Sequence, residues 1–168
     1  MATEIVGEYL LNLPTAVSVL KEIMEKAGVT KITVSSTNRT ADEQVSGMYG
    51  KKIKGVYVNY AKQGEAVLKV YDQAKVDGLS KADTLQLMKE ELVKQLPSAV
   101  IDKKLMHVNR EKDFLVFDIS ALAKDFVPSS KLDEFDKVAR QFCAEGKFHR
   151  FLGKKEEDPE AFHFEFQR

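Results

Sequence analysis

The last strand-like segment of the chain alternates large aromatic residues with polar ones, and this pattern constrains the fold more than any other. In Phe162-His163-Phe164-Glu165-Phe166, phenylalanine stands at every second position. Because successive side chains of a strand point to opposite faces, one face presents the three phenylalanines and the other presents His163 and Glu165. The chain must therefore contain a sheet with one aromatic core face and a second face that is not core alone.

Other segments predict further strands and helices around this sheet. Lys31 to Thr37 is rich in β-branched residues and Phe114 to Ile119 is a short apolar run, so both are predicted strands. Lys147 to Leu152 is predicted to pair with Ala161 to Phe166. Pro97 is expected to end one helix. Apolar residues at helical spacing predict helices that begin near Thr15, Thr40, Tyr57, Ser80 and Ser130. Thr15 and Ser130 are predicted N-caps, and Thr40 with Glu43 is predicted to form a capping box. We expect an α+β fold, in which helices flank a small antiparallel sheet that carries a metal cleft.

The composition restricts the classes of protein and of partner. With 168 residues, of which 43% are hydrophobic, the chain fits a single domain over residues 1–168. Lys plus Arg and Asp plus Glu both number 26, so no broad basic surface is available and nucleic acid is not an expected partner. Cys143 is the one cysteine, so a metal would need histidine and carboxylate ligands. The sequence does not determine the oligomeric state.

The first 15 residues carry two glutamates, no lysine or arginine and no sustained apolar run. Neither a signal peptide nor a membrane anchor is therefore expected, and the expected location is cytoplasmic. This location is compatible with action outside the cell after lysis or by another export route.

Polar side chains stand where the patterning predicts other residues. Asp118 interrupts an apolar strand, where a carboxylate is costly to bury unless it is paired or bound to a metal. Together with His107 and His163 it makes a set of two histidines and one carboxylate, which leaves one position of a zinc ion open. Glu160 lies three residues before His163, where it could act as a general base. The alternative interpretation is a satisfied core aspartate and two surface histidines.

The order of these motifs resembles the zinc D-alanyl-D-alanine peptidase family, which includes carboxypeptidases, dipeptidases and phage endolysins that cut peptidoglycan peptides. Residues 36–40 (STNRT), followed by Glu43-Gln44, are similar to the family's S-x-x-R-[ST]…EQ loop. The segment from His107 to Asp118-Ile119 is similar to its metal-binding His…Asp segment, and residues 160–163 (EAFH) to its closing E-x-x-H motif.

This resemblance implies an enzyme that hydrolyses a peptide bond in peptidoglycan-type peptides. It implies that zinc is the cofactor and that His107, Asp118 and His163 bind it. It further implies that Glu160 is the catalytic base and that Arg39 binds the substrate. The whole domain is included, because the ordered motifs span residues 31–166.

Three departures from the family pattern affect substrate class and turnover more than metal binding. Leu105 stands where the family often has a serine, and Phe162 where it often has a tryptophan. The spacing between His107 and Asp118 is also longer than is common in the family. Two other functions therefore stay open: a non-catalytic cell-wall or metal-binding module on the same fold, and a phage-associated structural protein. Metal analysis separates the structural protein from the other two, and an activity assay separates the enzyme from the module.

Overall fold

The computed structural model describes residues 2–56, 62–101, 107–108, 112–153 and 161–168 of the chain. These residues group into two compact units. The first unit is Met1–Asn38 with Arg110–Arg168, and the second is Arg39–Asn109. Whether the two fold together as the single domain expected from the composition stays a prediction.

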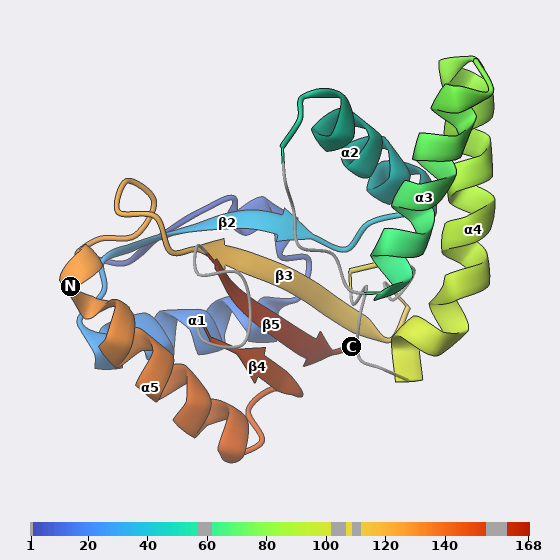
Figure 1. The fold of residues 1–168 in the computed structure, drawn as a ribbon. Helices are drawn as coiled ribbons and strands as arrows, with labels where there is room; N and C mark the ends of the chain where they lie inside the picture. The colour runs from blue at the N-terminus through green and yellow to red at the C-terminus, as the bar shows by residue number, and fades with distance from the viewer. Residues whose placement is uncertain (1, 57–61, 102–106, 109–111, 154–160) are drawn as a thin grey trace. The chain divides into compact units, whose positions relative to one another are not determined.

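The first unit contains a five-stranded sheet with the strand order β1-β2-β3-β5-β4 (Figure 1). β1 pairs in parallel with β2, and the other neighbours pair antiparallel. The sheet is therefore mixed at one edge, where the short strand β1 adds to the predicted antiparallel strands. The strands are β1 (Glu4–Val6), β2 (Lys31–Thr37), β3 (Phe114–Ser120), β4 (Arg150–Leu152) and β5 (Ala161–Gln167).

Two helices of the first unit, α1 (Pro14–Ala27) and α5 (Leu132–Ala144), pack with this sheet around one core. Both lie on the same side of the sheet in Figure 1. Every phenylalanine except Phe114 belongs to this buried core, and the aromatic face of β5 is part of it. Two short 3-10 helices, η1 (Glu8–Leu10) and η2 (Ser129–Lys131), precede α1 and α5. The predicted caps at Thr15 and Ser130 are wrong, because Leu13 and Lys131 occupy the N-cap positions without a side-chain hydrogen bond.

The second unit consists of the helices α2 (Ala41–Ile53), α3 (Lys62–Val76) and α4 (Lys81–Ile101). α3 and α4 run side by side, as Figure 1 shows, and the unit has a small core of its own around Val67, Met88 and Leu92. The capping box predicted at Thr40 is confirmed: the Thr40 side chain accepts from the backbone N–H of Glu43, whose carboxylate accepts from the Thr40 N–H. This cap fixes the start of α2 directly after Arg39.

α4 continues past Pro97, so the prediction that this proline ends the helix is wrong. Proline removes one backbone donor and crowds the preceding turn, which disfavours a helix interior. Pro97 lies on the exposed side of α4. Helical hydrogen bonds on the solvent side are the ones that already lengthen when a helix curves, which makes this side the more tolerant place for a missing donor.

The α+β class is confirmed, as is a small sheet flanked by helices. The strands predicted from residues 31 to 37, 114 to 119 and 161 to 166 are all present. A metal cleft on the sheet stays a prediction. Among the helices of the described ranges, none has the length and apolar character needed to cross a membrane.

Candidate metal centre

Asp118 and His163 lie opposite each other on neighbouring strands of the first unit. The antiparallel register of β3 and β5 pairs them directly. Nδ1 of His163 is 3.0 Å from Oδ1 of Asp118. His163 is 2% exposed, whereas the Asp118 side chain keeps 21% of its surface accessible. The carboxylate that interrupts the apolar strand is therefore paired with an imidazole, as its cost of burial requires.

The alternation of β5 places the two sets of side chains on opposite faces. Phe162, Phe164 and Phe166 belong to the aromatic core cluster, as predicted. His163 and Glu165 point to the other face, yet both are buried. The second face of β5 is therefore an interior surface that holds polar groups, and each of these groups needs a partner.

Glu165 is a partner of His163 to which sequence reasoning assigned no role. Its Oε1 is 3.2 Å from Nε2 of His163 and accepts a hydrogen bond from Nη1 of Arg150, also at 3.2 Å. The Glu165 side chain is fully buried, and that of Arg150 is 22% exposed. Arg150 lies opposite Glu165 in the register of β4 and β5. The signal that could have found this residue was present: the alternation places Glu165 and His163 on one face.

The two carboxylates determine the protonation of His163. Burial alone would lower the pKa of the imidazole, but the hydrogen bonds with Asp118 and Glu165, and their negative charges, outweigh it and raise the pKa from 6.5 to about 9. Without a metal, His163 is therefore an imidazolium at neutral pH that donates from both nitrogens. A metal ion would have to displace one of these protons.

Ser36 completes the row of polar residues on this face. Its Oγ donates a hydrogen bond of 2.7 Å to Oδ2 of Asp118. The Asp118 carboxylate thus has Ser36 on one oxygen and His163 on the other. Ser36, Asp118, His163, Glu165 and Arg150 form one connected network across β2, β3, β5 and β4 of the first unit. We call this the polar network.

Two other predicted site residues, Arg39 and His107, lie in the second unit. The backbone N–H of Arg39 donates to the carbonyl oxygen of His107 at 2.6 Å, and Arg39 forms an isolated parallel bridge with Val108. Nη1 of Arg39 donates to Oε1 of Gln44, a buried residue of α2, at 3.1 Å. Arg39 is half-buried. Its guanidinium is therefore held by α2, and its backbone is held by the segment that carries His107.

Asp118 and His163 are two of the three predicted ligands, and within the first unit each offers one atom that could hold a metal ion: Oδ1 of Asp118 and Nδ1 of His163, which are 3.0 Å apart. Whether His107 of the second unit joins them as the third ligand stays a prediction. Two nitrogens and one carboxylate oxygen suit zinc, but also other divalent transition metals, so this donor set fits zinc without identifying it. The predicted base, Glu160, and Leu105 both lie outside the described residues.

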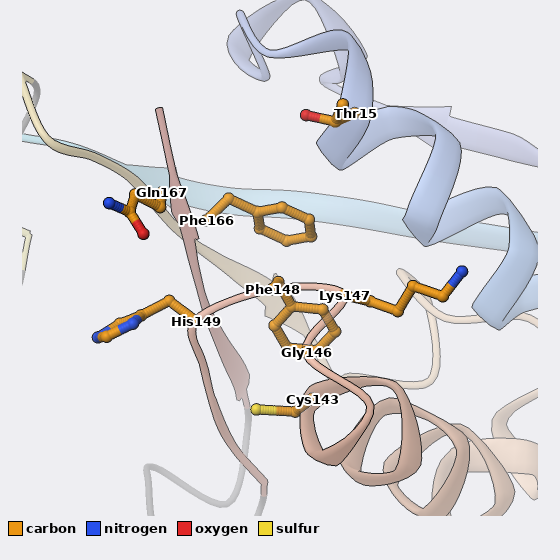
Figure 2. A pocket seen from close by; sticks show the side chains of 8 residues that line it. All are labelled: Thr15, Cys143, Gly146, Lys147, Phe148, His149, Phe166 and Gln167. Atoms are coloured by element: carbon orange, nitrogen blue, oxygen red, sulfur yellow. The ribbon is translucent and has the colours of Figure 1, made fainter.

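The remaining histidine and the cysteine lie near a hollow in the first unit that contains none of the predicted site residues. The hollow has a volume of about 520 Å³, and the rings of Phe148 and Phe166 stack beside it (Figure 2). His149 is exposed, and its ring centroid lies 4.8 Å from that of Phe114. Cys143 is half-buried against the core, and burial raises the pKa of its thiol. The hollow is lined by Thr15, Cys143, Gly146, Lys147, Phe148, His149, Phe166 and Gln167.

No family model, curated protein or solved structure was found to match this chain significantly. The resemblance to the D-alanyl-D-alanine peptidases therefore depends on the motifs and their order. Family membership stays a prediction.

Proposed function

We propose that this chain is a zinc peptidase that hydrolyses a peptide bond in peptidoglycan-type peptides, at D-alanyl-D-alanine or a related D-amino-acid linkage. His107, Asp118 and His163 are the proposed zinc ligands, Glu160 is the proposed catalytic base and Arg39 the proposed substrate-binding residue. The main support is one observation: Asp118 and His163, two of the three residues that the motifs single out, lie opposite each other in the first unit, with Oδ1 and Nδ1 3.0 Å apart. They stand 45 positions apart in the sequence, so this pairing is not a consequence of chain proximity.

The distance between Asp118 and His163 supports zinc binding. Ligand atoms about 2.0–2.1 Å from a tetrahedral zinc ion are separated by roughly 3.3 Å. Oδ1 of Asp118 and Nδ1 of His163 are 3.0 Å apart. The pair would need to separate by only a few tenths of an ångström to bind the same ion, so the backbone register of β3 and β5 could stay unchanged.

The chemistry proposed for the residues follows from the charge that each carries. When bound, zinc supplies a Lewis acid that polarises the scissile carbonyl and lowers the pKa of water. Glu160 takes the proton of the attacking water and passes it to the leaving amine as the C–N bond breaks. Arg39 presents a guanidinium fork, which suits a substrate carboxylate or a developing oxyanion. Asp118 reduces the positive charge of the site relative to a third histidine.

One observation favours a second candidate, a module that keeps the polar network for structural reasons and binds no metal. Both nitrogens of His163 already have carboxylate partners, Ser36 donates to the second oxygen of Asp118, and Arg150 donates to the Glu165 oxygen that also faces His163. Buried polar groups that are fully paired need no ligand. The two candidates differ in one measurable property, which is zinc binding.

Zinc content and zinc affinity of the purified full chain decide between them. We expect one zinc ion per chain in the wild type, and a large loss of affinity in Asp118→Asn and in His163→Gln. Asp136→Asn is the matched control, because Asp136 is also a hydrogen-bonded aspartate of the first unit, which accepts from Nε of Arg140 at 2.6 Å, and it is not among the proposed ligands. A wild type that binds no zinc would leave the structural module as the better account.

Activity is tested separately on the zinc-loaded protein. Amine release from D-alanyl-D-alanine and from cell-wall peptides is measured for the wild type and for the ligand variants. Cleavage by the wild type but not by the ligand variants supports the proposed peptidase function. If zinc is bound tightly and neither substrate is cleaved, the chain is a non-catalytic metal-binding module.

A further inference from the structure

We propose that Glu165, held by Arg150, is the positioning residue that makes Nδ1 of His163 the metal-binding atom. This inference rests on the proposed function, because it concerns the metal that the site is proposed to hold. It adds a residue to which the motifs assign no role, and it specifies the ring nitrogen and the tautomer. It also predicts which proton is lost when the metal binds.

The two nitrogens of His163 face two different carboxylates. Nδ1 lies 3.0 Å from Asp118, which is itself a proposed ligand. Nε2 lies 3.2 Å from Glu165. Since the metal would lie between Asp118 and His163, Nδ1 is the nitrogen on the metal side. Nε2 points away from it, towards Glu165.

Glu165 is suited to accept the remaining N–H and not to act as a ligand. Its Oε1 already accepts from Arg150 at 3.2 Å, and the guanidinium is always charged. An ionised carboxylate has acceptors only, so it favours the tautomer in which Nε2 carries the proton. A carboxylate that accepts from the far nitrogen of a metal-binding histidine is a common arrangement in metal sites.

The backbone prevents Glu165 from leaving this position. It stands in the middle of β5, opposite Val116 of β3 on one side and Arg150 of β4 on the other. The neighbouring residues Phe164 and Phe166 are buried in the aromatic core on the opposite face. Because a strand fixed on both edges cannot slip without turning every side chain to the other face, the carboxylate is held at His163.

The consequence is a preorganised ligand. The Glu165 contact fixes the orientation of the imidazole ring before metal arrives and makes the ligand more basic. Only the Nδ1 proton then has to leave when the metal binds. Losing this carboxylate should weaken metal binding while leaving all three ligands in place.

The first test uses the wild-type protein and needs no mutation. The chain has three histidines, so long-range proton–nitrogen NMR of protein labelled with ¹⁵N-histidine gives few signals, and His149→Gln removes one for assignment. We expect the zinc-loaded protein to show His163 with a proton on Nε2 and zinc on Nδ1. Zinc on Nε2 would overturn the inference.

The second test measures zinc affinity by competition with a chelator. Glu165→Gln keeps the size of the side chain and removes its charge. We expect its zinc affinity to fall roughly 10 to 100-fold, as is typical for partners of metal-binding histidines. Asp136→Asn, which changes an arginine-paired carboxylate on α5 in the same way, should bind zinc as the wild type does. Equal affinity in Glu165→Gln and the wild type would overturn the inference.

The outcomes separate this inference from the proposed function. If the wild type binds no zinc, the proposed function fails and this inference fails with it. If the wild type binds zinc through Nε2, or if Glu165→Gln binds it equally well, only the inference fails. Circular dichroism shows whether Glu165→Gln folds, and if it does not, the NMR measurement on the wild type decides alone.

Discussion

Ser36 reaches Asp118 because β2 carries an extra residue at this point. Val34 pairs with Ile119 and Ser36 pairs with Asp118, so two steps along β2 correspond to one step along β3. Such a bulge turns the following side chains to the other face. Val34 lies in the aromatic core, and without the bulge Ser36 would share that face. With it, the Ser36 hydroxyl donates to Oδ2 of Asp118 at 2.7 Å.

Removing this hydroxyl should affect both stability and metal binding. Ser36→Ala removes one donor to a partly buried carboxylate, and a hydrogen bond to a charged group contributes about 1.5–3 kcal/mol. The Asp118 side chain is 21% exposed, so water can partly replace the hydroxyl. We therefore expect the free energy of unfolding, measured with urea, to fall by about 1.5 kcal/mol, near the lower end of this range. Zinc affinity should fall roughly tenfold.

The control for this variant is the neighbouring serine. Ser35 is exposed, and its Oγ donates a longer bond of 3.3 Å to the backbone oxygen of Asp118. Ser35→Ala should therefore change the free energy of unfolding by no more than about 0.5 kcal/mol. Equal effects of the two substitutions would mean that the carboxylate does not depend on Ser36.

The metal-free protein should become less stable as the pH rises above neutrality. The pKa of His163 is raised from 6.5 to about 9 in the folded chain, with Asp118, Glu165 and Arg150 as the charged groups of its network. A histidine whose pKa is higher in the folded chain stabilises that chain fully at pH values below its pKa in the unfolded chain. This stabilisation is lost as the pH rises through the pKa of the folded chain. The urea midpoint, measured with a chelator present, should therefore decrease as the pH rises from about 6.5 to about 9.

Two further measurements check this assignment. His163→Gln cannot titrate, so its urea midpoint should vary less with pH over the same range. Zinc affinity of the wild type should change in the opposite direction and rise with pH, because the His163 proton competes with the metal. A wild-type midpoint that stays level from pH 6.5 to pH 9 would show that His163 is neutral at pH 7.

Much of the fold follows from local sequence patterns. The alternation in residues 162–166 identifies β5 and both of its faces, because strand geometry alone sets that period. The capping box at Thr40 identifies the start of α2, since it needs only residues three positions apart. The grouping of Asp118 with His163 was predicted from motif order, and register confirms the pairing of the two.

Features that depend on contacts between distant segments could not be predicted in the same way. The bulge near Ser35 is set by how β2 and β3 align, and 82 residues separate Ser36 from Asp118. In the local pattern Glu165 is one more polar residue of an alternating strand. Its ion pair with Arg150 depends on the pairing of β4 with β5. The effect of Pro97 likewise depends on which side of α4 faces solvent, and a local pattern does not show this.

Glu160 should be needed for turnover but not for zinc binding. A base must keep a carboxylate oxygen available for the proton of water, so Glu160→Gln should keep one zinc ion per chain. Its turnover of cell-wall peptides should fall by about 10²–10⁴-fold, the usual contribution of a general base. Glu156→Gln, four positions earlier in the same charged segment, is the control and should keep both properties. Loss of zinc from Glu160→Gln would make Glu160 a ligand instead.

Arg39 tests whether the site recognises a substrate. If Arg39 were an exposed loop residue, its loss would change the free energy of unfolding by no more than about 0.5 kcal/mol. The structure shows it half-buried, with its guanidinium on Gln44 at 3.1 Å. Arg39→Ala should therefore lower the free energy of unfolding by about 1 kcal/mol, the usual net contribution of one hydrogen bond. Gln44→Ala removes the same bond from the other side, so it should lower stability by a similar amount while keeping the guanidinium.

Catalysis should distinguish these two variants. A charge-assisted contact to the substrate contributes about 1.5–3 kcal/mol, so Arg39→Ala should lose roughly 10 to 150-fold in kcat/KM on D-alanyl-D-alanine at saturating zinc. Gln44→Ala should lose less, because its arginine stays charged and only its positioning suffers. Arg168→Ala, at an exposed arginine that donates to Asn12, should leave kcat/KM unchanged. If Arg39→Ala cleaves as fast as the wild type, the Arg39 guanidinium only stabilises the structure through its hydrogen bond to Gln44 and has no part in substrate binding.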